Sequence, residues 1–175
     1  RRAEEMRWGL IPAWAKSANQ IRSNFNARDD KVASSGLWKR PLARTRCIIP
    51  ASGFYEWTGP KGDRQPQLIR LNGGGLLGFA GLFDTWKNRE TGETVRSCAI
   101  ITTGPNALME PIHDRMPVIL DAEAEALWLD PATEDPERLS ALLQPYPAEE
   151  MEKYSVSTAV NSSRVDSPEM IERVE

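Results

Sequence analysis

Histidine and cysteine are the scarcest reactive residues in this sequence of 175 amino acids, which has one histidine, His113, and two cysteines, Cys47 and Cys98. There is no C-x-x-C pair and no cluster of His and Cys, so we expect no metal site, and we predict no cofactor. Both cysteines lie in apolar segments, and two cysteines are too few for a disulfide framework. We therefore expect both thiols to be reduced, unpaired and buried.

Long apolar runs are absent as well. No stretch approaches the roughly 18 apolar residues that a membrane-spanning helix needs, and the charged residues 1–5 are unlike a signal peptide. We therefore expect a soluble, cytoplasmic protein without a membrane partner. The first residue is not methionine. This start predicts a fragment or a processed product, with further sequence upstream.

The length and the 40% apolar content suit a single domain over residues 1–175 with a real core. About eight short strands and two or three helices are expected, and they predict an α+β fold with a mostly antiparallel, barrel-like sheet. Asn72–Gly75 should connect strands 67–71 and 76–83 as a hairpin. Asp121 should cap a helix to about 129, and Pro136 should begin another to about 143. We expect residues 23–28 to be a polar loop and the acidic C-terminus to be frayed.

The charges are distributed unevenly along the chain. Residues 1–70 hold 14 Lys and Arg against 6 Asp and Glu, whereas residues 71–175 hold 8 against 19. The basic half also carries Trp8, Trp14, Phe25 and Trp38, interleaved with the cations Arg7, Lys16, Arg22, Arg28, Lys39, Arg40, Arg44 and Arg46. Cations that bind phosphates and rings that stack on bases suit a single-stranded nucleic acid, although an ordinary solvated basic face is the alternative.

The sequence from Arg46 to Trp57, RCIIPASGFYEW, contains the most informative carboxylate. Residues 47–49 and 54–57 have strand patterns, with a bend expected after Pro50. Glu56 lies among three aromatic residues, and burial in such a wall would disfavour its charged form. Glu56 could then act as a general acid or base, or it could simply face solvent while the rings pack.

Two further segments carry candidate site residues. His113 lies between Pro111 and Pro117, and its unperturbed pKa is close to physiological pH. Arg115 could share the face of His113 and suit an anionic ligand, whereas Asp114 should point away from it. Near the start of the chain, Gly9 would let a ligand or another backbone segment approach the ring of Trp8.

Five segments together resemble the SOS-response-associated peptidase (SRAP) family, and they follow the family's order through nearly the whole chain. They are RWGLIPAW, FNAR, RCIIPASGFYEW, IHDRMPVIL and VSTAVNSSR. The resemblance implies recognition of abasic sites in single-stranded DNA by a protein that is expected to be a monomer. It also implies a covalent crosslink to that DNA. The nucleophile would be a cysteine exposed when the protein removes its own initiator methionine, and its amine and thiol would form a thiazolidine with the sugar aldehyde.

The resemblance also implies roles for individual residues. Asn26 would orient the reacting cysteine or the sugar, Glu56 would act as acid and base, and His113 would assist opening of the sugar ring. Arg28 and Arg115 would hold phosphates, and Trp8 with Gly9 would shape the nucleotide pocket. Asn26, Glu56 and His113 are expected to converge on one cleft.

The family's N-terminal cysteine has no counterpart here, because neither Cys47 nor Cys98 can supply an N-terminal amine. We expect the complete protein to begin Met-Cys, with several tens of residues before Arg1. Two other functions stay open. One is a cysteine or serine peptidase, for which Ser52 and Ser157 are poor nucleophile candidates, and the other is a non-catalytic module that binds single-stranded nucleic acid.

Overall fold

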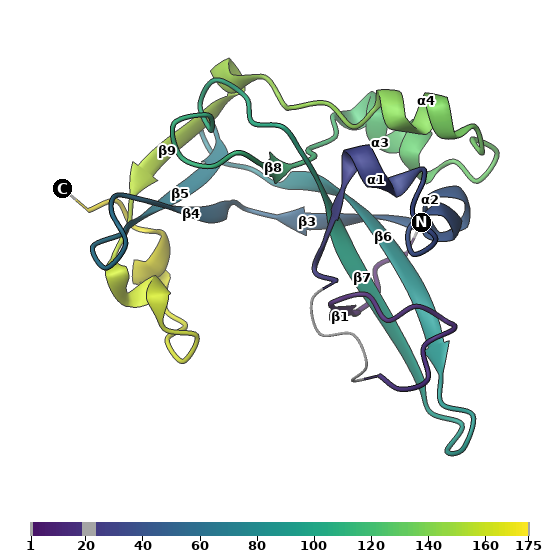
Figure 1. The fold of residues 1–175 in the computed structure, drawn as a ribbon. Helices are drawn as coiled ribbons and strands as arrows, with labels where there is room; N and C mark the ends of the chain where they lie inside the picture. Colours follow the sequence, from purple (N-terminus) through teal and green to yellow (C-terminus); the bar gives the residue numbers. More distant parts are fainter. Residues whose placement is uncertain (1, 19–23, 175) are drawn as a thin grey trace. The chain divides into compact units, whose positions relative to one another are not determined.

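A computed structural model describes residues 2–18 and 24–174 and shows an α+β architecture (Figure 1). Packing divides the chain into two compact units that interleave along the sequence. Unit 1 comprises residues 1–49, 78–103 and 117–145, and unit 2 comprises residues 50–77, 104–116 and 146–175. None of the helices in the described ranges is long and apolar enough to cross a membrane.

Unit 1 is organised around β7 (Thr94–Thr103), the centre of a six-stranded sheet. β6 (Leu77–Lys87) pairs with β7 in antiparallel register and continues the sheet to β3 (Arg46–Ala51). The sheet also contains three short strands that pair with β7, namely β1 (Arg7–Trp8), β2 (Asn26–Arg28) and β8 (Met116–Pro117). β1 and β2 both run parallel to β7 and take successive positions along it.

Four short helices accompany this sheet, namely α1 (Asp29–Val32), α2 (Lys39–Arg44), α3 (Ala122–Leu129) and α4 (Pro136–Ala141). The carboxylate of Asp121 accepts the backbone N–H of Ala124 at 2.8 Å, which confirms the predicted cap of α3. Pro136 begins α4 as predicted, although the helix ends two residues early. Trp128 of α3 is fully buried in the main core, where it lies with the core residues Leu10, Val32, Leu82, Ile101 and Leu139.

Unit 2 contains a three-stranded antiparallel sheet with the order β4 (Phe54–Thr58), β5 (Gln65–Leu71), β9 (Met151–Ser155). Three 3-10 helices flank β9 in sequence: η1 (Ala148–Glu150) precedes it directly, and η2 (Thr158–Asn161) and η3 (Pro168–Ile171) come after it. The C-terminal segment is anchored rather than frayed up to Val174. Its N–H donates to the carbonyl of Ser155 at 2.9 Å.

The predicted hairpin of strands 67–71 and 76–83 is wrong in its pairing, although both strands exist. β5 pairs with β4 and β9, whereas β6 pairs with β7 and β3 in the other sheet. The connection contains three successive glycines with positive φ angles of 72°, 88° and 114°, Gly73, Gly74 and Gly75. Glycine adopts these angles without strain, and at this run the chain leaves the sheet of β5 and enters the sheet of β6.

Other sequence predictions need adjustment. The barrel-like sheet is not confirmed, since neither of the two described sheets closes on itself. The expected loop over 23–28 contains β2 from Asn26 onward, while Ser23 lies outside the described residues. β3 continues through Pro50 to Ala51, and the bend follows at Ser52, within the segment where it was predicted. Cys47 and Cys98 are unpaired, as expected; Cys98 is buried and Cys47 is partly so.

Candidate functional site

Glu56 lies in the middle of β4, on the face opposite its neighbouring aromatic residues. Tyr55 donates its hydroxyl to the carbonyl of Met170, and the indole N–H of Trp57 donates to the Asn161 side chain at 2.7 Å. Successive side chains of a strand point to opposite faces, so Glu56 faces away from these two rings. The predicted wall of three aromatics around the acid is therefore wrong, because only Phe54 shares the face of Glu56.

The face of β4 that carries Glu56 is polar. Gln67 lies directly across from Glu56 on β5, and Ser155 on β9 lies across from Gln67. The Gln67 amide donates to the Ser155 hydroxyl at 3.0 Å and to the Thr58 hydroxyl at 3.4 Å. A row of hydrogen-bonding groups thus crosses the three-stranded sheet beside the carboxylate.

Burial raises the pKa of Glu56 above its ordinary value. The neighbouring His113 opposes this shift, Asp114 adds to it, and a hydrogen bond from the Trp57 backbone opposes it. These influences also show that Glu56 and His113, which are far apart in sequence, lie close enough in unit 2 to interact electrostatically. A carboxyl group with a raised pKa beside an imidazole is a suitable pair for transferring protons near neutral pH.

The imidazole of His113 is held by the backbone that follows it. Its Nδ1 accepts the N–H of Arg115 at 3.0 Å, and the Arg115 carbonyl lies 3.1 Å from the same atom. Both contacts engage Nδ1 with the backbone of Arg115, so Nε2 is the ring nitrogen outside these contacts. His113 is exposed, so Nε2 is the ring nitrogen that suits proton exchange with a substrate.

Asp114 contacts His113, contrary to the prediction that it would point away. Its Oδ1 lies 3.3 Å from Nδ1 of His113. The prediction assumed an extended backbone, but residues 107–112 form turns and the chain has not returned to a strand at 114. Arg115 contacts the imidazole of His113 through its backbone N–H. This contact orients the ring independently of what the Arg115 side chain binds.

Trp8 and Phe25 form an exposed aromatic pair in unit 1. Their ring centroids are 5.4 Å apart with an interplanar angle of 69°, and 55% of Trp8 is accessible to solvent. The indole N–H of Trp8 donates to the carbonyl of Phe25 at 3.0 Å. Gly9 has φ +104°, and a Cβ there would lie 3.1 Å from the Phe25 ring. Glycine therefore favours this pair, because any Cβ at position 9 would displace the Phe25 ring and strain the backbone.

Asn26 and Arg28 flank a buried residue of β2. Ala27 is fully buried, so by strand alternation Asn26 and Arg28 lie on the exposed side. The guanidinium of Arg28 forms an ion pair with Asp30 at 3.0 Å. Unit 1 thus carries Trp8, Gly9, Asn26 and Arg28, and unit 2 carries Glu56, His113 and Arg115. Arg22, another cation of the basic half, lies outside the described residues.

The two cysteines lie in environments that suppress nucleophilic reactivity. Burial, with a smaller contribution from Cys98, raises the pKa of Cys47 to about 12, and burial also raises the pKa of Cys98. A thiol is reactive as its thiolate, so both are poor nucleophiles. Ser157 uses its hydroxyl to accept the N–H of Ala159 at 3.2 Å at the start of η2.

Sequence reasoning missed Gln67, Ser155 and Phe25. Gln67 and Ser155 follow the two-residue alternation of their strands, but their alignment with Glu56 depends on strand pairing. Phe25 was identified only as an aromatic residue of the basic half. The described residues contain no group of three or more His, Cys, Asp or Glu side chains that could hold a metal ion.

Comparison with known proteins supports the resemblance seen in the motifs. A family model described as "SOS response associated peptidase (SRAP)" matches residues 1–163. The chain belongs to the SRAP family. The "Abasic site processing protein YoqW" of Bacillus subtilis is 49% identical over 173 residues, which cover 98% of this chain and 76% of that protein.

Other SRAP relatives are more distant. The "Abasic site processing protein HMCES" of Xenopus tropicalis is 38% identical over 186 residues, which cover 94% of this chain and 55% of that protein. A crystal structure of a protein from Bacteroides thetaiotaomicron superposes with a TM-score of 0.88 at 32% identity, covering 96% of this chain and 75% of that one. The fold described here is thus shared with a solved structure.

Proposed function

We propose that this SRAP chain belongs to a protein that processes abasic sites in single-stranded DNA as a monomer. The observation that carries the proposal is the interacting pair Glu56 and His113, in which burial raises the pKa of the carboxyl group. Family membership supports it, as do the names of relatives such as YoqW, an abasic site processing protein.

The proposed reaction is a condensation between the sugar and an N-terminal cysteine. The protein first removes its initiator methionine by hydrolysis and so exposes the amine of this cysteine. The amine attacks C1 of the ring-opened sugar, and loss of one water gives a Schiff base. The thiol then adds to the C=N bond, its proton passes to nitrogen, and a thiazolidine closes. Aldehyde and aminothiol thus yield the crosslink and water, and no oxidant is needed.

Glu56 and His113 would move the protons of this sequence. Glu56 would accept the proton that the amine loses as it adds to the aldehyde and return one to the departing water, which requires a pKa near the working pH. His113, whose Nδ1 is held by the Arg115 amide, would use Nε2 to assist ring opening of the sugar. Opening needs a proton on the ring oxygen and removal of one from the C1 hydroxyl.

The remaining site residues would bind and orient DNA. Trp8 offers an exposed indole for stacking on a base, and Gly9 keeps the space that the Trp8–Phe25 pair needs. Arg28 and Arg115 would bind phosphates, for which Arg28 would exchange its ion pair with Asp30. Asn26 would orient the reacting cysteine or the sugar.

The test uses the complete protein with its native N-terminus and an abasic single-stranded oligonucleotide. Covalent adduct is followed on a denaturing gel, and binding of the same strand without a lesion is measured separately. Glu56→Gln keeps the shape of the side chain but cannot titrate. It should slow crosslinking by roughly 10²–10⁴-fold, the usual contribution of general acid–base catalysis, and leave binding close to wild type.

Glu137→Gln is the matched control, because Glu137 is an exposed carboxylate in α4 of unit 1. It should crosslink at the wild-type rate. If Glu56→Gln also crosslinks at that rate, Glu56 has a structural role and the proposed mechanism fails. Cleavage of casein without any DNA adduct would favour the peptidase alternative, and binding without either reaction would favour the non-catalytic module.

A further inference from the structure

The loop that carries His113 is built as two successive turns. The N–H groups of Met109 and Glu110 donate to the backbone carbonyl of Asn106 at 3.0 and 2.9 Å. The N–H groups of Ile112 and His113 donate in turn to the carbonyl of Met109 at 2.8 and 3.0 Å. Met109 is fully buried and belongs to both turns. The backbone position of His113 therefore depends on the turn that begins at Asn106.

The side chain of Asn106 closes the first of these turns. Its Oδ1 accepts the N–H groups of Leu108 at 3.1 Å and Met109 at 3.0 Å. This is the arrangement of an Asx turn, in which a short side chain takes the place of a backbone acceptor. Asn106 thus holds Met109 through both its backbone and its side-chain carbonyl, and the Met109 carbonyl holds His113.

The amide nitrogen of the same side chain fixes the turn to the rest of unit 2. Nδ2 of Asn106 donates to the carbonyl of Tyr146 at 2.7 Å and lies 3.4 Å from the sulfur of the buried Met151, the first residue of β9. The backbone N–H of Asn106 donates to the sulfur of Met116 at 3.4 Å, which closes the base of the loop from 106 to 116. One side chain therefore connects the turns before His113 to β9.

The contacts of the imidazole itself do not replace this connection. Nδ1 of His113 contacts the backbone of Arg115, which belongs to the same loop. These contacts fix the ring relative to the loop, whereas Asn106 fixes the loop relative to β9 and hence to the sheet that carries Glu56. A displacement of about 1 Å caused away from the reacting atoms can cost about 10²-fold in rate.

We propose that Asn106 is a positioning residue, which holds His113 at the distance from Glu56 and the sugar that proton transfer requires. Asn106 acts through the two turns of residues 106–113 and not on the substrate itself. The proposal rests on the proposed function, in which His113 assists ring opening. Its structural part, the dependence of the His113 backbone on Asn106, is measured without any reaction.

The first test measures amide hydrogen exchange of the complete protein by NMR. Ile112 and His113 donate to the Met109 carbonyl, so their exchange reports the second turn. Asn106→Ala should speed exchange at both amides by roughly 5- to 30-fold, the effect of one or two hydrogen bonds. Asn106→Ser should recover part of the protection, because a hydroxyl forms the same kind of turn more weakly.

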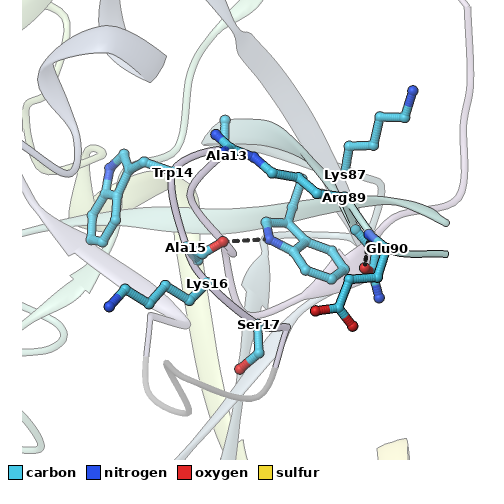
Figure 2. A pocket seen from close by; sticks show the side chains of 10 residues that line it. Ala13, Trp14, Ala15, Lys16, Ser17, Lys87, Arg89 and Glu90 are labelled. Carbon is cyan, nitrogen blue, oxygen red and sulfur yellow. Dashed lines mark hydrogen bonds between the residues drawn. The ribbon is translucent and has the colours of Figure 1, made fainter. Parts of the chain in front are cut away.

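Two control variants separate this effect from a general loss of stability. Asn72 also donates its side-chain amide to a backbone carbonyl of unit 2, that of Glu149 at 2.6 Å. In unit 1 the indole N–H of Trp86 donates to the carbonyl of Ala15 at 2.8 Å, in the wall of the pocket in Figure 2. Asn72→Ala and Trp86→Phe each remove one such bond, and both should leave exchange at residues 112 and 113 unchanged.

The second test compares crosslinking rates with an abasic single-stranded oligonucleotide. Asn106→Ala should slow the reaction roughly 10- to 100-fold, less than His113→Gln does, and should bind the undamaged strand like wild type. Asn106→Ala combined with His113→Gln should react no more slowly than His113→Gln alone, because a positioning residue has no effect once the group that it positions is gone. A merely structural role would give additive losses.

The outcomes distinguish a failure of this inference from a failure of the proposed function. Wild-type exchange at Ile112 and His113 in the Asn106→Ala protein would refute the inference, as would additive rate losses in the double variant. A wild-type crosslinking rate in His113→Gln would instead overturn the role of His113 in the proposed function. The exchange rates would still decide whether Asn106 holds the loop.

Discussion

Replacing Gly9 with alanine should destabilise the protein through a local and calculable conflict. The backbone of Gly9 has φ +104°, a conformation that costs an L-residue about 1–2 kcal/mol. The new Cβ would also lie 3.1 Å from Cε1 of Phe25, so the ring must move by a few tenths of an ångström. We expect the free energy of unfolding to fall by about 1.5–2.5 kcal/mol, in the range of strained-backbone substitutions.

The assay is urea unfolding, followed by the intensity of tryptophan fluorescence, with near-ultraviolet circular dichroism to monitor the Trp8–Phe25 pair. At about 2–4 °C per kcal/mol for a chain of this size, the melting temperature should drop by about 3–10 °C. Binding of single-stranded DNA should weaken as well, because the Phe25 ring that packs against Trp8 is displaced.

Gly36→Ala is the matched control, because a Cβ there meets no atom within 4 Å and the φ angle is not positive. This substitution should change stability by no more than about 0.5 kcal/mol. Equal stability of the Gly9→Ala and Gly36→Ala proteins would refute the reasoning, since it would show that neither the backbone angle nor the contact with Phe25 is under strain.

Further predictions concern the acid, the DNA-binding residues, the thiols and a helix cap. The pKa of Glu56 is raised in the folded state, so the contribution of its protonated form to stability is complete below the unfolded-state pKa and is lost as the pH rises through the folded-state pKa. Glu56→Gln should therefore raise the thermal unfolding temperature at about pH 8 but not at about pH 3. Arg28→Ala should reduce the steepness of the salt dependence of single-strand binding by about 0.7, whereas Trp8→Ala should weaken binding without changing the slope. A chain that starts at Arg1 should form no adduct with abasic DNA on a denaturing gel, because the partly buried Cys47 has no adjacent amine and a pKa of about 12. Asp121→Ala should cost about 1 kcal/mol in urea unfolding, the usual value of a helix cap.

Local signals in the sequence predicted several elements correctly because their causes are local. The cap at Asp121 and the proline at the start of α4 act within one helical turn. The apolar segment at residues 95–103 likewise corresponds closely to β7. Buried residues follow one another in this strand, as is typical of a strand that is covered on both faces. These features depend on residues that are neighbours in sequence.

Strand pairing could not be predicted in the same way. The glycine-rich residues 72–75 looked like a hairpin turn, yet β5 and β6 belong to different sheets. The observed partners of β5 are β4 and β9. A short turn connects β4 to β5, whereas β9 lies far from β5 in the sequence. β2 was missed because its strand character comes from pairing with β7 rather than from its own three residues.

The sequence pointed to Glu56 and His113 as candidate site residues, and their catalytic roles stay predictions, but their surroundings were not predicted correctly. Glu56 and His113 interact in unit 2, in agreement with the importance given to both. The environment assigned to Glu56 was wrong, although strand alternation alone places Tyr55 and Trp57 on the other face. The aromatic residues therefore anchor the C-terminal segment through Met170 and Asn161 rather than enclose the acid.

This difference changes the explanation of the raised pKa of Glu56. An aromatic wall would disfavour the carboxylate in every state of the reaction, and an acid held neutral in this way would keep its proton and donate it poorly. On the polar face, burial raises the pKa while His113 lowers it and Asp114 raises it. The preference of Glu56 for its proton therefore depends on the charge of His113. A carboxyl group whose proton affinity changes with the charge of its neighbour can both accept and donate a proton. The proposed condensation takes up a proton in one step and releases one in the next, and such a group suits both steps.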